Sequence, residues 1–471
     1  MGVKMADLFK VGTKNRNGKA VPLLTNFYGE LLTANSGRYV PRRDENTAAN
    51  MEAFRRAAWK KYIESEHVFL DTSAYLNGWR NAGANTNVTI EKAEISDGEY
   101  GLKITPGNAT SVLVGKTFTA DLSGYDGFMY TVDVSNVDAL DRFNVVFEAP
   151  DSENRFYRAE SGNATVLLDV KSIFGKGTLT MRKTSFGTAG TPTWSNVGKI
   201  YFAIKAKDGM DLSVTISNVK MVKQKPKNAK LILRIDDGLQ SVYNVAMPIF
   251  KQYNIPATCF INPGFILPGE HVQHPAYGGN PAMSLEEVEY LHSLGWGICS
   301  HTFFHNLYAD PTVDASANYP RKYYYQAYAD LSATQDWLID HGFADGAIGH
   351  VYGNHYYNGE TLAAALDLFP LDFSAHSYSA YYSPLPWGSS LRHISSDTFT
   401  QKTGDTYPNI DSLANGKGIG VVMMHRFDGD NIDGSMSAAT LEAMLQYIVD
   451  RGDIDCITAT DLAYATPAAL R

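Results

Sequence analysis

The chain has 471 residues, which is too long for one ordinary hydrophobic core and predicts two or three domains. Its net charge is -9 and it contains no basic stripe, which excludes nucleic acid as its main partner. No stretch is long and apolar enough to cross a bilayer, so membrane insertion is not expected either.

The first segment, residues 1–66, is expected to form an N-terminal arm and a helix. Residues 1–44 show little periodicity, which predicts an extended arm. Between Thr47 and Glu64, apolar residues follow at helical spacing: Met51, Phe54, Ala58 and Tyr62. A helix packed on its own domain is the simpler interpretation, and pairing with another chain is the alternative. Residues 1–18 are polar, so export by a signal peptide is not expected.

Residues 67–222 show short alternating runs, which predict a β-sandwich of the jelly-roll type. The clearest run, residues 128–134, places an apolar side chain at every second position and predicts one buried face. Similar runs occur at residues 102–104, 143–147, 166–170, 200–204 and 212–216. The run ending at Val222 resembles the last strand of a carbohydrate-binding module. A sugar-binding domain and a purely structural spacer are both open.

A polar linker is predicted at residues 223–229, and residues 230–471 form the last predicted domain. Strand-like runs occur at residues 231–235, 257–261, 297–301, 346–352, 391–395, 419–425 and 455–459. Helical stretches occur near residues 241–253, 284–294, 326–341, 359–369 and 437–451. This alternation predicts a parallel α/β sheet or barrel. Residues 284–287 read Ser-Leu-Glu-Glu, a capping box that begins a helix.

Five residues with useful chemistry follow strands of this domain: Asp236, Asp237, His301, Tyr352 and His425. In a parallel α/β fold the carboxyl ends of the strands meet at one mouth, where active sites are found. Taken alone, Asp-Asp-Gly is a turn, and a single histidine is more often part of a core. His301 also begins a His-x-x-x-His sequence that ends at His305. Two histidines and a carboxylate are the ligand set of an open catalytic zinc site. If His301 and His305 share one helical turn, their spacing places them on one face.

Several motifs carry a resemblance to a known family. Residues 234–238 read Arg-Ile-Asp-Asp-Gly, residues 301–306 read His-Thr-Phe-Phe-His-Asn, and residues 421–425 read Val-Val-Met-Met-His. They resemble the first, second and fifth motifs of the polysaccharide deacetylase family (carbohydrate esterase family 4, the NodB-homology fold). The third motif, normally Arg-x-Pro-Tyr or Tyr-Pro-Tyr-Gly, is represented only by His-Val-Tyr-Gly at residues 350–353. The resemblance covers residues 230 to about 465.

The resemblance implies a distorted (β/α)7-type barrel and a role for each matched residue. Asp237, His301 and His305 would bind one divalent metal, with zinc expected and cobalt, nickel or manganese as alternatives. Asp236 would act as the general base and His425 as the general acid.

Other residues are assigned to substrate binding or to orienting the base. A backbone N–H near Tyr352 would stabilise the oxyanion, Trp387 would line a sugar groove, and Arg392 is a further candidate for contact with the oxyanion or the substrate. The arginine and the proline of the third motif are missing. Because that arginine normally holds the base, Arg392 or Arg426 is expected to replace it.

The main functional expectation is a metal-dependent deacetylase of a bacterial surface polysaccharide, either capsule or O-antigen. The order of the modules resembles a phage tail spike or fibre, which predicts a virion location or action outside the cell after lysis, with the cytoplasm as the alternative. A homotrimer and other tail proteins would then be further partners. One rival is a receptor-binding tail protein or adhesin that binds glycan without catalysis. The other is a hydrolase of small amides.

Overall fold

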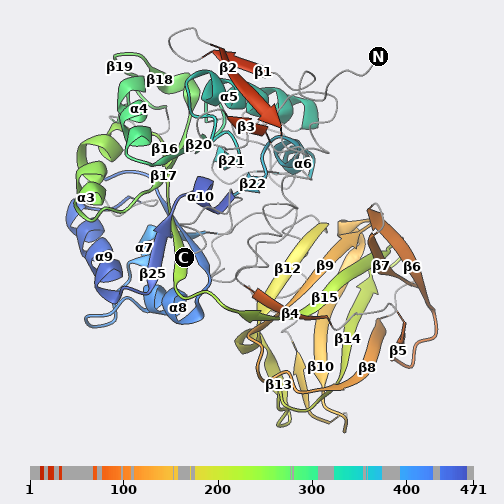
Figure 1. Cartoon of the computed structure of the whole chain (residues 1–471). Helices are drawn as coiled ribbons and strands as arrows, with labels where there is room; N and C mark the ends of the chain where they lie inside the picture. The colour runs from red at the N-terminus through yellow and green to blue at the C-terminus, as the bar shows by residue number, and fades with distance from the viewer. Residues whose placement is uncertain are drawn as a thin grey trace. The chain divides into compact units, whose positions relative to one another are not determined.

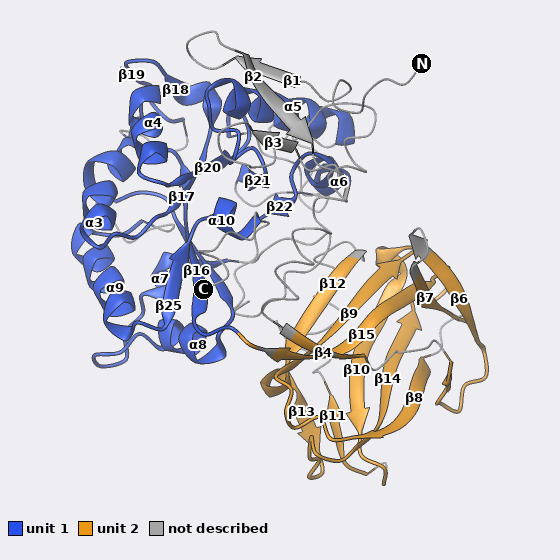
Figure 2. Ribbon diagram, viewed as in Figure 1, with its two compact units in different colours: residues 1–65, 226–381, 390–471 blue, residues 66–225, 382–389 orange. Residues whose placement is uncertain are grey.

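Figure 1 shows the computed structural model of the chain, which describes residues 11–14, 20–25, 31–33, 67–71, 77–96, 99–107, 111–151, 153–157, 170, 176–275, 277, 280–305, 323–353, 357, 359–373, 393–427 and 435–463. The chain divides into two compact units (Figure 2). Unit 1 comprises residues 1–65, 226–381 and 390–471, and unit 2 comprises residues 66–225 and 382–389. Strand β15 ends at Gln224 and β16 begins at Ala229, so strand residues occupy part of the predicted linker.

The segment predicted as an extended arm contains three short strands. They are β1 (Val11–Lys14), β2 (Ala20–Thr25) and β3 (Leu31–Thr33), and they form an antiparallel sheet in the order β1-β2-β3. The sequence analysis missed them because each is short and because Gly12 and Pro22 interrupt the apolar pattern. The helix predicted at residues 47–64 lies outside the described residues.

Unit 2 contains two six-stranded antiparallel sheets, as its alternating runs predict. The first has the order β13-β11-β10-β14-β8-β5, with bounds β13 (Gly187–Ala189), β11 (Arg155–Tyr157), β10 (Leu140–Glu148), β14 (Val197–Ala206), β8 (Val112–Ala120) and β5 (Trp79–Asn81). The second has the order β12-β9-β15-β7-β6, with bounds β12 (Lys176–Arg182), β9 (Gly127–Val134), β15 (Val214–Gln224), β7 (Glu99–Pro106) and β6 (Val88–Ser96). Strand β4 (His67–Asp71) pairs with β15. The strand predicted at residues 166–170 falls mostly outside the described residues, and Val170 is helical.

The core of unit 2 is built from aromatic and branched apolar side chains. On β9 the residues at every second position, from Phe128 to Val134, are almost completely buried, which matches the predicted period of two. The ring of Tyr130 stacks 5.9 Å from that of Phe143 and lies 5.7 Å from that of Phe202. Rings from β9, β10 and β14 therefore pack on one another and hold the two sheets together.

Unit 1 contains a parallel sheet whose described part has eight strands. Its order is β22-β21-β20-β17-β16-β24-β23, with β25 also paired to β16. The bounds are β16 (Ala229–Asp237), β17 (Thr258–Ile261), β20 (Gly297–Ser300), β21 (Gly349–His350), β22 (Leu371–Asp372), β23 (Ile394–Ser395), β24 (Ile419–Met424) and β25 (Ile454–Ile457). No pairing among the described residues joins β22 to β23, so the described sheet is an open half-barrel. All seven predicted strands have counterparts, whereas the two-residue β22 was not predicted.

Helices pack around this sheet (Figure 1). They are α3 (Met247–Gln252), α4 (Leu285–Ser293), α5 (Tyr324–Asp340), α6 (Gly359–Leu368), α7 (Ser396–Phe399), α8 (Pro408–Gly416), α9 (Ala438–Arg451) and α10 (Ala459–Ala463). Of these, α3, α4 and α9 line one side of the sheet in Figure 1. A π-helical segment, Val242–Ala246, precedes α3. The side chain of Ser284 accepts from the backbone N–H of Glu287 in a complete capping box at the start of α4, which confirms that prediction.

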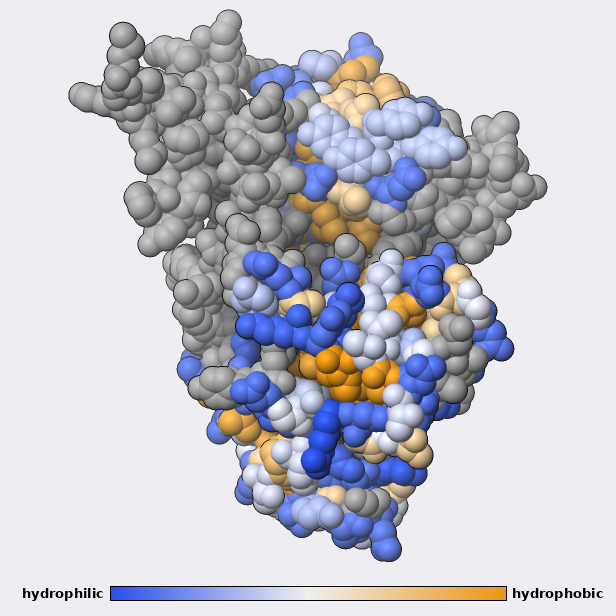
Figure 3. All heavy atoms as spheres, turned by 90° about the vertical axis from the view of Figure 1, so that its right-hand side faces the viewer, coloured by the Kyte–Doolittle hydropathy of each residue, from blue (hydrophilic) through white to orange (hydrophobic). Residues whose placement is uncertain are grey.

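The exposed surface is of mixed character. On the face shown in Figure 3, hydrophilic side chains predominate and hydrophobic ones lie among them. Large exposed rings are present at Phe304 and at three consecutive tyrosines, residues 323–325. Among the described helices, none combines the length and the apolar character that crossing a bilayer requires.

Candidate active site

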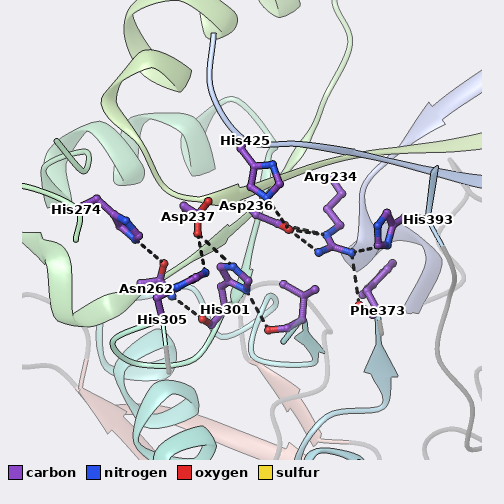
Figure 4. Close-up of polar contacts among 11 residues, drawn as sticks. Arg234, Asp236, Asp237, Asn262, His274, His301, His305, Phe373, His393 and His425 are labelled. Atoms are coloured by element: carbon purple, nitrogen blue, oxygen red, sulfur yellow. Dashed lines mark hydrogen bonds and ion pairs between the residues drawn. The ribbon is translucent and has the colours of Figure 1, made fainter. Parts of the chain in front are cut away.

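The site begins at the carboxyl end of β16, where successive side chains point alternately to the two faces of the sheet. Leu231, Leu233 and Ile235 point into the core under the helices. Because successive side chains point to opposite faces, Arg234 and Asp236 lie together on the inner face of the half-barrel. The strand then turns at Asp237, whose φ of 73° lies in the left-handed region, and at Gly238 with a φ of 70°. Asp236 and Asp237 are thereby directed to different partners (Figure 4).

Three predicted metal ligands come together at this mouth. Nε2 of His301 lies 3.2 Å from Oδ1 of Asp237, and Nε2 of His305 lies 3.4 Å from the same oxygen. One ligand atom from each of the three residues lies within 4.8 Å of the other two. Parallel pairing of β16 with β17, and of β17 with β20, brings residues about sixty positions apart to one edge. This is the grouping that a single metal ion requires.

The two histidines do not share a helical turn, so they come together by another route than the spacing on one helix face. Residues 301–305 form a loop in which Thr302 and His305 have φ values of 66° and 53°. The side-chain amide of Asn262 donates to the backbone carbonyls of both His301 and Thr302 and holds this loop. Nε2 of His274 lies 3.2 Å from Oδ1 of Asn262 and fixes the amide in turn. Strained backbone held from several sides is typical of functional sites.

The donor set fits a divalent cation. Both carboxylate oxygens of Asp237 are fully buried, and within the described parts of the chain neither accepts a hydrogen bond of acceptable geometry. A buried carboxylate without such a partner is costly, and a cation beside the two imidazoles would supply one. Nδ1 of His301 lies 3.1 Å from the carbonyl oxygen of Val351, so donation there directs Nε2 toward Asp237.

Burial and neighbouring charges separate the pKa values of these groups. Burial raises the pKa of Asp236, but the charge of Arg234 and then that of His301 outweigh it and lower the pKa to about 2. The pKa of Asp237 is lowered in the same way, mainly through His301 against the opposing effect of burial. Burial lowers the pKa of His305 to about 4, so its imidazole is neutral at pH 7 and able to bind a metal.

Asp236 has a different set of neighbours from Asp237. Nε of Arg234 donates to Oδ1 and Oδ2 of Asp236 at 2.8 Å and 3.1 Å, and the Nη2 group of the same arginine donates to Oδ2. Nε2 of His425 lies 3.9 Å from Oδ2. The predicted acid and base therefore face each other at the mouth, beside the ligand group (Figure 4).

The remaining predicted site residues fall into two groups. Tyr352 is fully buried, and its ring stacks 4.8 Å from that of Tyr357. Trp387 and Arg392 lie outside the described residues. The guanidinium carbon of Arg426 lies 6.0 Å from the ring centroid of Tyr277, and the contacts to Asp236 come from Arg234 instead.

Three residues of the site were not predicted from the sequence: Arg234, Asn262 and His274. Arg234 had a usable signal, since a charged residue inside an apolar strand and two positions before Asp236 must share its face. Asn262 follows β17 in the same way that Asp237 ends β16. His274 belongs to the segment after the β18 (Ile266–Leu267) and β19 (Glu270–His271) hairpin, and no strand pattern predicts its return to the mouth.

Three solved structures are similar to parts of the chain. A family 4 acetyl xylan esterase from Clostridium thermocellum, solved with a cobalt ion, is 14% identical, with 51% of this chain and 93% of that chain covered and a TM-score of 0.32. The Xyl-CE4 domain of a xylanase from the hindgut metagenome of Trinervitermes trinervoides is 12% identical, with 50% and 89% covered and a TM-score of 0.30. A family 11 carbohydrate-binding module from Clostridium thermocellum is 12% identical, with 33% and 93% covered and a TM-score of 0.25.

The family model gives the more direct result. No curated protein matches the sequence. Residues 223–368 match the family model described as polysaccharide deacetylase, and this stretch contains Asp236, Asp237, His301 and His305. The resemblance is thereby confirmed for residues 223–368, which belong to the polysaccharide deacetylase family and contain the first and second motifs; the fifth motif, residues 421–425, lies outside this match.

Proposed function

We propose that the chain is a metal-dependent deacetylase that removes acetyl groups from a bacterial surface polysaccharide, either capsule or O-antigen. The observation that carries this proposal is the cluster of Asp237, His301 and His305 beside a separate buried carboxylate, Asp236. Ligands and base are different residues, so a metal bound by Asp237 and the two histidines leaves Asp236 able to accept a proton from water.

In this proposal Asp237, His301 and His305 hold one divalent metal, with zinc favoured by the two imidazoles and the carboxylate. When bound, the metal supplies a Lewis acid and lowers the pKa of a water molecule. Asp236 is ionised at neutral pH because its pKa is about 2, so it is able to accept the proton of the attacking water. His425 donates a proton to the departing sugar oxygen or nitrogen.

The substrate oxygen also needs donors where negative charge develops. We assign this role to the backbone N–H of Tyr352, which follows β21 at the same mouth. Trp387 and Arg392 complete the proposed substrate groove. Unit 2 is proposed to bind the polymer or to act as a spacer, because its sheets form a domain separate from the catalytic one. The module order supports a trimeric tail spike acting outside the cell, which light scattering and detection of the chain in purified virions would test.

The test is release of acetate from a panel of purified acetylated capsules and O-antigens, compared with acetylated monosaccharides and small amides. We expect the wild-type protein to act on at least one polymer and to prefer it to the small compounds. Asp236→Asn and His301→Ala should each lose turnover by at least about a hundredfold. Asp405→Asn, in an exposed turn of unit 1, is the matched control and should retain it.

Three outcomes would redirect the proposal. Polymer binding without acetate release, with metal bound, would favour a receptor-binding protein. Preference for small amides would favour the small-amide hydrolase. Unchanged release by either site variant would reject the assigned roles of Asp236 and His301.

A further inference from the structure

Arg234 is the most unusual residue of the half-barrel. It is a long cationic side chain with no exposed surface, on the central strand β16. Its Nε and Nη2 groups both donate to the carboxylate of Asp236, in the two-point geometry that an arginine forms with a carboxylate. Asp236 is therefore held in one orientation by its neighbour two positions earlier on the same strand.

The other side of the guanidinium is also fixed. Nη1 donates to the carbonyl oxygen of Phe373 at 3.4 Å and lies 3.1 Å from Nδ1 of His393. His393 is itself buried, and donation by the arginine places the histidine proton on Nε2. The guanidinium carbon lies 5.8 Å from the ring centroid of Phe260. Segments around β17, β22 and β23 thus hold Arg234 in place, and Figure 4 shows this row of contacts leading to Asp236.

The strand that begins the third motif has no arginine, and its first residue is closely packed. Strand β21 consists of Gly349 and His350. A Cβ atom at Gly349 would lie 2.9 Å from Sγ of Cys299, which is closer than real contacts allow. The side chain of His350 contacts Ser300: Nδ1 of His350 lies 3.1 Å from Oγ of Ser300.

We infer that Arg234 is the positioning residue for the general base Asp236, supplied from the first-motif strand in place of the arginine that the third motif lacks. This inference rests on the proposed function. Each carboxylate oxygen has two acceptor positions, so the pairing with Arg234 leaves Asp236 able to accept a proton from water. Arg234 fixes which of these positions faces the ligand group, and His393 fixes Arg234.

The main test is a double-mutant cycle on the full chain with zinc bound, using kcat/KM for acetate release from the preferred polymer. Arg234→Gln should lower kcat by about a hundredfold or more with little change in KM, because it disturbs the base and not substrate binding. Arg234→Lys should recover only part of this loss, since an ammonium group lacks the planar fork. In an Asp236→Asn background, Arg234→Gln should cost less than about threefold.

Two controls separate positioning from general damage. Zinc stoichiometry should remain one per chain in every variant, because Arg234 contacts none of the three ligands. Arg451→Lys is the matched substitution, since Arg451 forms the same fork with Asp453 two positions away on the outside of the sheet, and it should leave kcat unchanged. If Arg234→Gln proves too unstable, His393→Ala should show a smaller fall in kcat with the same dependence on Asp236.

Additive effects of Arg234→Gln and Asp236→Asn would overturn the inference, as would loss of zinc from Arg234→Gln. If the wild-type protein releases no acetate, the proposed function fails, and the inference is then judged on a crystal structure of Arg234→Gln. Rotation of the Asp236 carboxylate away from its wild-type position would support positioning by Arg234. An unmoved carboxylate would contradict it.

Discussion

The core of unit 2 and the mouth of unit 1 are both buried, but their side chains differ: those in unit 2 are apolar, and those in unit 1 include charged groups. The sandwich packs rings on rings, as Phe128, Tyr130 and Phe202 show, and this burial stabilises the fold directly. Strand β16 of unit 1 instead buries Arg234 and Asp236, whose transfer out of water is costly unless they are paired. The comparison indicates that burial in unit 2 serves stability, whereas burial of the charged pair on β16 is costly to stability and is explained by the proposed function.

The largest effect is expected from a substitution that removes one side chain from the mouth and leaves both cores unchanged. His425→Ala should lower kcat for acetate release by about 10²- to 10⁴-fold, because the leaving group loses its proton donor. Zinc binding should be unaffected, since His425 faces Asp236 and is not one of the clustered ligands. Steady-state kinetics with metal analysis of the same samples would check both points, and full activity would remove His425 from the mechanism.

The effect of the buried Arg234–Asp236 pair on the free energy of unfolding can be measured directly. Arg234→Met should destabilise unit 1 by about 4 kcal/mol, because it leaves the Asp236 carboxylate buried without its partner. The double variant Arg234→Met with Asp236→Leu should recover most of that loss and remain inactive. Urea unfolding followed by hydrogen exchange of β16 would report the change. Equal destabilisation by the single and double variants would mean that the charges themselves are not the cost.

A change in the sandwich should act on stability alone. Ile204→Ala, at a fully buried position of β14, should destabilise unit 2 by about 3 kcal/mol through lost burial and the cavity it leaves. Zinc stoichiometry and kcat on a monomeric acetylated sugar should stay at wild-type values. Hydrogen exchange would locate the loss in unit 2, and an equal loss of protection in β16 would contradict the separation of the two regions.

The buried histidines give the mouth a pH-dependent stability that the sandwich core lacks. Burial lowers the pKa of His350 well below 6.5, and it lowers the pKa of His274 and His305 as well. As the pH falls below 6.5, these three histidines take up protons in the unfolded chain but not in the folded chain. The stability that they contribute is therefore full above 6.5 and falls below it, whereas the raised pKa of His301 acts in the opposite direction.

His350→Gln should remove one buried histidine of lowered pKa. The free energy of unfolding should then decrease less steeply with falling pH, by about 1.4 kcal/mol per pH unit between roughly pH 6 and 5. Urea midpoints of the metal-free protein across this range provide the measurement. An unchanged slope would show that His350 does not stay neutral in the folded chain.

Much of the fold was predictable because its signals are local. The period of two on β9 and the capping box at Ser284 each depend on a few neighbouring residues, and both are present. The strands β1 to β3 and β22 were missed because each has only two to six residues, which carry little pattern, and because β1 and β2 also contain a glycine or a proline. The grouping of Asp237 with the two histidines followed from strand ends that meet at one edge.

What the sequence did not reveal depends on contacts between distant segments. The partner of Asp236 was sought at Arg392 and Arg426, although Arg234 lies two positions away on the same face. The return of His274 to the mouth depends on how a hairpin packs, and no spacing in the chain reports it. Short-range periodicity therefore predicted which strands form, while the partners of the buried groups required coordinates.

The central claim is that Asp237, His301 and His305 hold one metal ion, and zinc titration of the metal-free full chain by calorimetry tests it most directly. We expect one tight site per chain in the wild-type protein and in Asp405→Asn, and loss of that site in Asp237→Ala and His305→Ala. Tight zinc binding that survives both substitutions, or no binding by the folded wild-type protein, would contradict it.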